Sequence, residues 1–244
     1  MRAFIAFVSL CLPLLAHADC KDRFTQWANA LQPGRTVDAD HAACKVWPEN
    51  PAQTLAVLPL PQKGASEDQT VYDVEVLVAD SNTGAVLAHQ YQPSAITSDA
   101  MALESIELDT AAWRLTPQQL AFGVRQTFDG SSRVNPAEQT QLSLYVVEGR
   151  AIRRVLGNLT TRGSNGEWDG DCAGQFTDTS RVISMGPAGH GGYATLIVRE
   201  NTVNTTKTGT GDQCKSRSKT TKRPPVTLQY DGSRYDVPAA FSGD

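Results

Sequence analysis

The sequence is poor in the side chains and motifs on which many catalytic sites depend. It has only 4 His among 244 residues, and it has no G-x-S-x-G nucleophile elbow. No Gly-rich phosphate-binding loop leads into a helix, so a nucleotide cofactor is not indicated. The formal net charge of −4 has the wrong sign for a dedicated nucleic-acid binder. We therefore expect a binding protein with a protein partner, not an enzyme and not a nucleic-acid-binding protein.

Long apolar runs are absent except at the start of the chain. A basic Met1-Arg2 precedes an uncharged apolar run that ends at Leu15, and Ala16-His17-Ala18 follows as a small-x-small cleavage site. This order is typical of a secretory signal peptide. The run is too short to span a bilayer, and no later stretch is apolar enough. The sequence thus predicts removal of residues 1–18 and a periplasmic protein without membrane insertion.

Cysteine is also scarce, and Cys11 belongs to the predicted signal peptide. Cys20, Cys44, Cys172 and Cys214 remain, an even number in an oxidising compartment. Four cysteines allow three pairings. We favour Cys20–Cys44 and Cys172–Cys214, because each pair lies within one end of the chain and closes a loop long enough to restrict the unfolded state. A zinc site is the alternative, disfavoured by the lack of C-x-x-C spacing.

The first part of the predicted mature chain, residues 19–50, reads as a helical cap tied by a disulfide. Apolar residues at helical spacing predict a short helix over residues 22–31, and Pro33-Gly34 ends it. Residues 51–69 form a Pro-rich connection. Because proline removes backbone donors, any strand there should be short or at an edge.

A β domain is predicted over residues 70–244. Val74, Val76 and Val78 share one face of a strand, while Asp73 and Glu75 point away. Similar short strands follow, separated by turn signals that include the segment 163–166. The pattern predicts an all-β fold, an antiparallel β-sandwich or barrel. A small propeller-like arrangement is the alternative, although no fixed-period repeat is present.

The densest group of carboxylates comprises Glu167, Asp169 and Asp171, beside Trp168. A flexible loop with several carboxylate oxygens could hold calcium. Ordinary turn chemistry is the other interpretation, since Asp side chains accept hydrogen bonds from their own backbone. A third is a glycosidase pair formed by Glu167 and Asp169, whose carboxyls would share a face of an extended segment.

Two further segments stand out. Gly189, His190, Gly191, Gly192 and Tyr193 form a Gly-rich loop that could enter a partner's cleft, or that could simply connect two strands. Five basic residues also follow Cys214 within nine positions: Lys215, Arg217, Lys219, Lys222 and Arg223. The first three alternate with serine as Lys-Ser-Arg-Ser-Lys, which in a strand would place these cations on one face. They indicate either a contact surface for an anionic partner or a charged edge strand that resists aggregation.

The layout resembles a family of periplasmic immunity proteins that neutralise peptidoglycan hydrolases. The resemblance is carried by the segment 166–172, the hydrophobic strand after it and the final hairpin 230–235, and it covers about residues 70–240. The topology of that family is similar to that of periplasmic I-type lysozyme inhibitors. The resemblance implies inhibition of a secreted hydrolase, and calcium binding in some members, which would involve Asp169 and Asp171.

An inhibitor needs a rigid scaffold and a few anchor side chains. We expect Tyr193 to anchor the first choice of binding loop and Trp168 the second. The alternatives are a carbohydrate-active hydrolase that uses Glu167 and Asp169, and an envelope module that binds a ligand or has a structural role.

Overall fold

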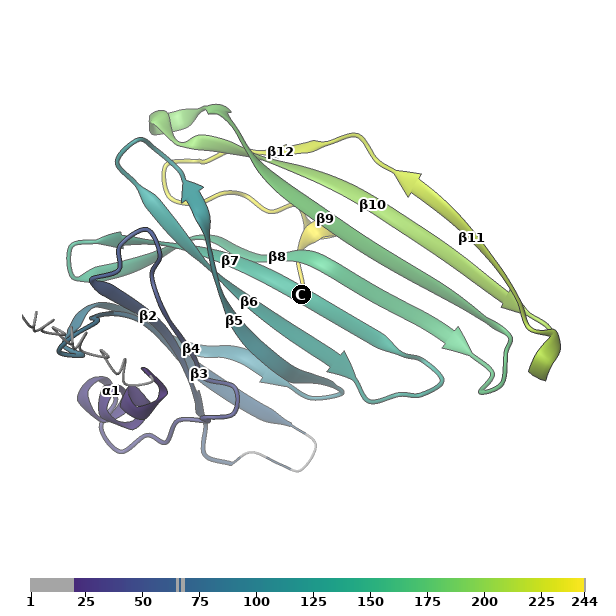
Figure 1. Cartoon of the computed structure of the whole chain (residues 1–244), viewed down its shortest axis with the longest axis horizontal. Helices are drawn as coiled ribbons and strands as arrows, with labels where there is room; N and C mark the ends of the chain where they lie inside the picture. The colour runs from purple at the N-terminus through teal and green to yellow at the C-terminus, as the bar shows by residue number, and fades with distance from the viewer. Residues whose placement is uncertain (1–19, 65, 67–68, 244) are drawn as a thin grey trace, which may run out of the picture.

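The computed structural model describes residues 20–64, 66 and 69–243, and the predicted signal peptide 1–18 lies outside them. The described residues form one sheet of twelve strands and one α-helix (Figure 1). The strands are β1 (Ala43–Val46), β2 (Gln53–Pro61), β3 (Thr70–Asp80), β4 (Val86–Ser98), β5 (Met101–Arg114), β6 (Leu120–Gly130), β7 (Ala137–Glu148), β8 (Ala151–Trp168), β9 (Gly174–Ala188), β10 (Ala194–Thr208), β11 (Lys215–Lys222) and β12 (Val226–Leu228). The helical segments are η1 (Cys20–Arg23), α1 (Phe24–Leu31), η2 (His190–Gly192), η3 (Gly211–Gln213) and η4 (Ala239–Phe241).

Eight of these strands curl into a nearly closed barrel. Their order is β1-β2-β3-β4-β8-β7-β6-β5, and β5 at one end lies against β1 and β2 at the other. The predicted face of Val74, Val76 and Val78 points into this barrel, where Phe122 stacks on Tyr145. The all-β prediction with an N-terminal helix is confirmed, and the barrel, not the propeller-like alternative, is the form that the sheet takes.

The short helix α1 covers the outside of the barrel. Phe24, Trp27 and Ala28 pack on the outward side chains of β2 and β3, so these two strands are buried on both faces. The Trp27 indole donates a hydrogen bond to the Gly84 carbonyl oxygen (2.8 Å). The predicted Cys20–Cys44 disulfide joins η1 to β1 and fixes the helix on the sheet.

The sheet begins earlier than the sequence predicts, because β1 and β2 lie in the expected cap and the Pro-rich connection. The prediction that a strand there is short or at an edge is wrong for β2, which has 9 residues and lies between β1 and β3. Pairing with β1 stops at Val57, so Pro59 and Pro61 lie where that side of β2 has no strand partner. The Pro59 carbonyl accepts a hydrogen bond from the Asp38 amide on this open side, where a missing N–H is tolerated.

Asp73 and Glu75 point away from the barrel interior, as predicted, but they are buried. They are 3% and 0% exposed, because the chain that follows α1 covers them. Asp73 accepts hydrogen bonds from Arg35, Gln62, Tyr91 and the Ser94 amide, and Glu75 accepts from Gln32 and faces the His89 imidazole. Burial would raise the pKa of Asp73, but these hydrogen bonds outweigh it and hold the pKa well below its usual range.

A second hydrophobic core lies on the outer side of the barrel. It joins β7 and β8 to β10, β12 and the C-terminal segment, through side chains such as Leu144, Leu156, Leu196 and Tyr235. The predicted hairpin over residues 230–235 is present, closed by a bridge between Tyr230 and Tyr235.

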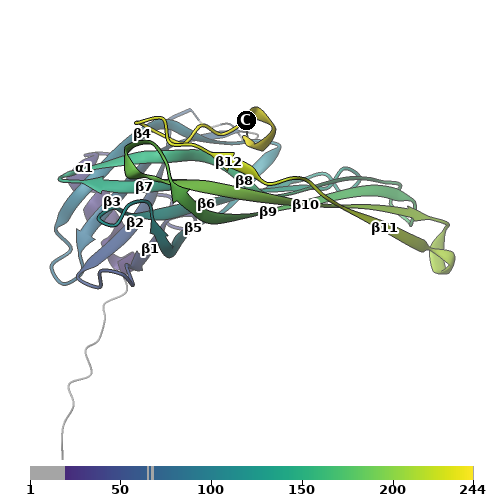
Figure 2. The same ribbon diagram turned by 90° about the horizontal axis from the view of Figure 1, so that it is seen from above.

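Beyond the barrel, the long strands continue as a thin sheet, which Figure 2 shows extending away from the main body. We call residues 162–180 and 201–222 of this sheet the blade. The predicted turn at residues 163–166 is wrong, because these residues lie inside β8. Residues 163–165 pair with both β7 and β9, and Gly166 pairs with Phe176 on β9. Strand β11 forms the outer edge of the blade, and all its residues are exposed. Its basic residues therefore lie on an edge strand, as one of the two interpretations predicts.

Candidate functional site

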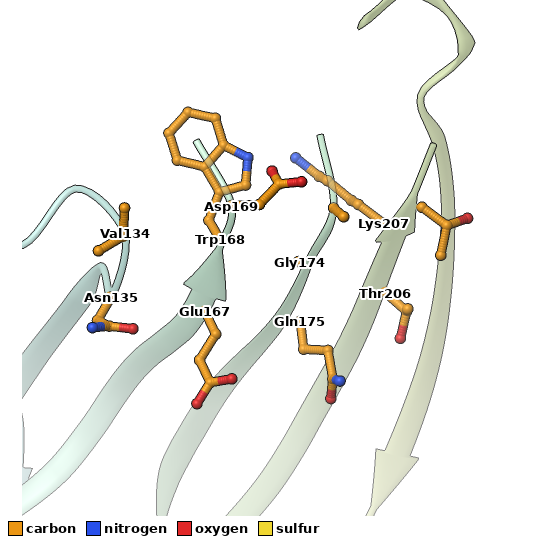
Figure 3. Close-up of a pocket in the computed structure, with 11 residues that line it drawn as sticks. Val134, Asn135, Glu167, Trp168, Asp169, Gly174, Gln175, Thr206 and Lys207 are labelled. Carbon is orange, nitrogen blue, oxygen red and sulfur yellow. The ribbon is translucent and has the colours of Figure 1, made fainter. Parts of the chain in front are cut away.

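An open groove of about 530 Å³ lies at the far end of the blade (Figure 3). Four segments line it: the turn between β6 and β7, the end of β8, the start of β9 and the end of β10. We call it the tip groove, and its lining residues are Val134, Asn135, Glu167, Trp168, Asp169, Ala173, Gly174, Gln175, Thr206, Lys207 and Thr208. The structure thus brings three of the sequence-predicted residues, Glu167, Trp168 and Asp169, into one site.

The position of Trp168 is fixed by its backbone. Its amide donates a hydrogen bond to the Val134 carbonyl (2.8 Å), and Trp168 pairs with Gly174 on β9. A Cβ at Gly174 would approach the Glu167 carbonyl oxygen to 2.6 Å, so this position requires glycine. The indole therefore projects from a backbone that is held on both sides, as Figure 3 shows.

A network of short-range bonds stiffens the two turns at the tip. One carboxylate oxygen of Asp169 accepts hydrogen bonds from the Asp171 and Cys172 amides, both at 2.9 Å. Asp171 reaches across to the other turn and accepts from the Gly211 amide (3.0 Å). The predicted Cys172–Cys214 disulfide joins the same two turns covalently. The tip is therefore a cross-linked unit rather than two independent loops.

The groove carries charges of both signs. The amide of Asp171 is the first of several backbone donors that hold the pKa of Asp169 below its usual value. The Lys207 ammonium lies 5.0 Å from the centre of the Phe176 ring, in a cation–π arrangement. In Figure 3 the Lys207 side chain points toward Asp169, whereas Glu167 points the other way. An aromatic ring flanked by an ammonium group, carboxylates and amides can recognise a polar surface or side chain.

The carboxylates at the tip do not gather into one metal-binding group. Among the described residues, no group of three or more His, Cys, Asp or Glu side chains could hold a metal ion. One oxygen of Asp169 accepts amide hydrogen bonds from its own turn, as turn chemistry predicts. One oxygen of Asp171 accepts from the Gly211 amide of the other turn. The calcium site at Glu167, Asp169 and Asp171 therefore stays a prediction without geometric support.

The Gly-rich loop lies at the other end of β9 from the tip groove. β9 has 15 residues, so at about 3.3 Å per residue its ends are roughly 45 Å apart. Gly191 and Gly192 adopt positive φ angles of 60° and 77°, which glycine permits. The Tyr193 ring stacks on Tyr230 at 3.9 Å and packs against the second core, while Gly189 and His190 are exposed. The two predicted loops thus cannot enter one cleft together.

Sequence reasoning missed most of the residues that complete the groove, among them Asn135, Gln175, Thr206 and Lys207. Asn135 lies in the connection between β6 and β7, which also carries the Val134 carbonyl that Trp168 binds. The position of this connection beside Trp168 depends on the register between β7, β8 and β9, which turn signals alone do not specify. The predicted Cys172–Cys214 disulfide was the one signal in the sequence that the end of β10 lies near the same tip.

Comparison of the chain with family models, with curated proteins and with solved structures finds no match. No helix among the described residues is both long and apolar enough to cross a membrane. The two disulfides indicate folding in an oxidising environment outside the cytosol.

Proposed function

We propose that this protein is a periplasmic binding protein that blocks a peptidoglycan hydrolase by inserting the tip of its blade into the enzyme's cleft. The observation that carries the proposal is the position of the tip groove. It lies at the end of a thin extension, beside a disulfide that joins the two turns of that end. The resemblance to periplasmic immunity proteins supports the same role and includes the segment around Trp168.

The physical argument rests on rigidity. A binding loop that is already ordered loses little conformational entropy when it enters a cleft. The hydrogen bonds of Asp169 and Asp171, together with the Cys172–Cys214 bond, order the tip before any partner arrives. A single aromatic anchor on such a surface can carry a large share of the binding free energy.

We assign the anchor to Trp168 rather than to Tyr193. The Tyr193 ring is stacked on Tyr230, so its use as an anchor would require removal from the protein's own core. Trp168 is only half-buried and lines an open groove. An inhibitory role needs no catalytic pair, and the different directions of Glu167 and Asp169 in Figure 3 favour this role over a glycosidase.

The experiment measures release of dye from labelled peptidoglycan by a lysozyme, an amidase and an endopeptidase, each with and without the protein. We expect protection against one of these classes. Trp168→Ala should weaken that protection about 30-fold, the effect of losing a strong anchor. Val182→Ala is the matched control, because Val182 is 66% exposed on β9 and does not line the groove.

Failure to slow any of the three hydrolases would contradict the proposal and favour an envelope module without a hydrolase target. Release of dye by the isolated protein, abolished by Glu167→Gln, would instead establish the hydrolase alternative.

A further inference from the structure

A second cavity of about 530 Å³ lies where β4 and β8 separate. These strands form a parallel pair only at His89 and Ala151, after which their paths diverge. The C-terminal segment runs across β8 beside this opening, where the Tyr235 amide donates to the Val155 carbonyl (2.7 Å). We call the remaining space the seam cavity, which is lined by β4, β8 and the C-terminal segment.

An irregularity in β8 shapes the cavity wall. The register with β7 shifts between the pair Leu142–Leu159 and the pair Leu144–Leu156, which leaves a bulge around Asn158. Asn158 has a φ of 47°, a conformation that few residues other than glycine adopt. The Asn158 amide donates a hydrogen bond to the Ser143 hydroxyl (3.1 Å), and the Asn158 carbonyl accepts one from the Gly243 amide (3.2 Å). The wall is therefore held in place before any ligand binds.

The bulge also makes room for a cation. A Cβ at Gly157 would lie 3.4 Å from the Nε atom of Arg154, so the guanidinium lies directly over this glycine. Burial raises the pKa of the Tyr145 phenol. A hydrogen bond with Gln92, and then the positive charge of Arg154, oppose that rise in pKa. Arg154 thus stands between the barrel interior and the seam cavity.

The cavity is locally positive in a protein of negative net charge. Arg154 and Arg234 both line it, and Asp236 is the one acidic side chain in its lining. Within the described part of the chain, neither arginine forms an ion pair within 4.0 Å. The neighbouring Arg153 differs, because it is bound to Glu148 and to the Ser233 carbonyl.

Neutral polar groups complete the lining. Gln90 faces the cavity and is linked through Gln92 to the Tyr145 hydroxyl, by hydrogen bonds of 3.0 Å and 3.2 Å. Amide and hydroxyl groups of this kind suit the hydroxyls of a small polar ligand. The volume falls within the range of about 300–1,000 Å³ that is typical of small-molecule sites.

We propose that the seam cavity binds a small hydroxylated molecule through an anionic group, a carboxylate or a phosphate, held by Arg154 and Arg234. Guanidinium groups bind either oxyanion with charge-assisted hydrogen bonds. This site is separate from the tip groove and does not depend on the function proposed for it.

The test is a calorimetric titration of the full chain with glucuronate, with glucose 6-phosphate and with glucose. We expect saturable binding of at least one of the two anionic sugars and at least tenfold weaker binding of glucose. Glucuronate alone would identify a carboxylate site, and glucose 6-phosphate alone would identify a phosphate site. Absence of binding by both, or equal binding of glucose, would overturn the proposal.

Variants connect the binding to the cavity. Arg154→Gln and Arg234→Gln should each weaken binding about tenfold, because each removes a charge-assisted hydrogen bond. Arg162→Gln is the matched control, since Arg162 is exposed on the same strand β8 and does not line the cavity. Thermal unfolding of the three variants establishes that they are folded. Unchanged affinity in both folded cavity variants would overturn the assignment.

Discussion

The barrel and the blade are parts of one sheet, yet their strands face opposite environments. In the barrel, β3 is buried along nearly its whole length, because the core covers one face and α1 with the following chain covers the other. In the blade, all of β11 is exposed. Its neighbour β10 changes from mostly buried residues, where it packs in the second core, to mostly exposed or half-buried residues in the blade. The comparison teaches that the blade is stabilised by strand pairing and one disulfide rather than by a core.

The largest expected effect is a loss of stability that distinguishes the barrel, which has a core, from the blade, which has none. Phe122 is fully buried between Trp47 and Tyr145, whereas Phe176 is half-buried on the blade. Phe122→Ala should lower the free energy of unfolding by about 4 kcal/mol. Phe176→Ala should lower it by only about 1–2 kcal/mol, because the ring is half-buried and packs mainly on Gly166, Gly174 and Lys207 rather than in a core. Urea denaturation measures both, and equal losses would contradict the division into a core-stabilised barrel and a blade without a core.

A smaller loss of folding free energy is expected when Asp73, a buried acid on the outside of β3, is replaced. Asp73→Ala leaves Arg35, Tyr91 and Gln62 without their shared acceptor, which should cost about 3 kcal/mol. Asp178→Ala, an exposed carboxylate on the blade, is the matched control and should change stability by less than about 0.5 kcal/mol. If the two substitutions have similar effects in urea denaturation, the Asp73 network does not hold the N-terminal segment to the barrel.

Three carboxyl groups with lowered pKa values, among them Asp73 in this network, predict a pH dependence. Asp38, Asp73 and Asp109 all have pKa values below the usual range, because hydrogen bonds outweigh the effect of burial. A lowered folded-state pKa gives stability that is complete above the unfolded value of about 4 and is lost as the pH falls toward the folded value. We expect the urea midpoint to be constant near neutral pH and to fall between about pH 4 and pH 2. Asp73→Asn should flatten this fall, and an unchanged profile in the variant would count against the network.

The sequence allows these networks to be foreseen only in part. The alternation of Val74, Val76 and Val78 shows which side chains share the inner face, because that depends on local geometry alone. It does not show that Asp73 and Glu75 are covered, since the covering residues Gln32 and Arg35 lie about 40 positions earlier in the chain. Burial of a second face depends on tertiary packing, which a period of two does not encode.

The structural role of the glycines near residue 165 could not be predicted from the sequence, for a related reason. The glycines near residue 165 predict a turn, but a Cβ at Gly166 would come within 2.5 Å of the Phe176 ring. Glycine is required there for close approach across the ladder and not for a reversal of the chain. The candidate site shows the same limit, since Glu167, Trp168 and Asp169 are neighbours in sequence, whereas Lys207 joins them only through the strand register.

The disulfide at the tip allows a test of whether the blade is stabilised separately from the barrel. The Cys172–Cys214 bond closes a separation of 42 residues. Replacing both cysteines by serine should raise hydrogen exchange of the blade-tip amides about 30-fold and leave the barrel amides unchanged. Removal of Cys20–Cys44 by the same double substitution is the control, because that bond fixes α1 on the barrel. Loss of barrel protection in the Cys172 and Cys214 variant would show that the blade is no separate unit.

The central claim is that the protein acts through the end of its blade and that the barrel is the scaffold. Its most direct test is the dissociation constant for a hydrolase that the wild-type protein inhibits, measured for Trp168→Ala and for Val182→Ala. The account predicts an increase of about 30-fold for Trp168→Ala and no change for Val182→Ala. Equal affinity of the Trp168 variant and the wild type would contradict it.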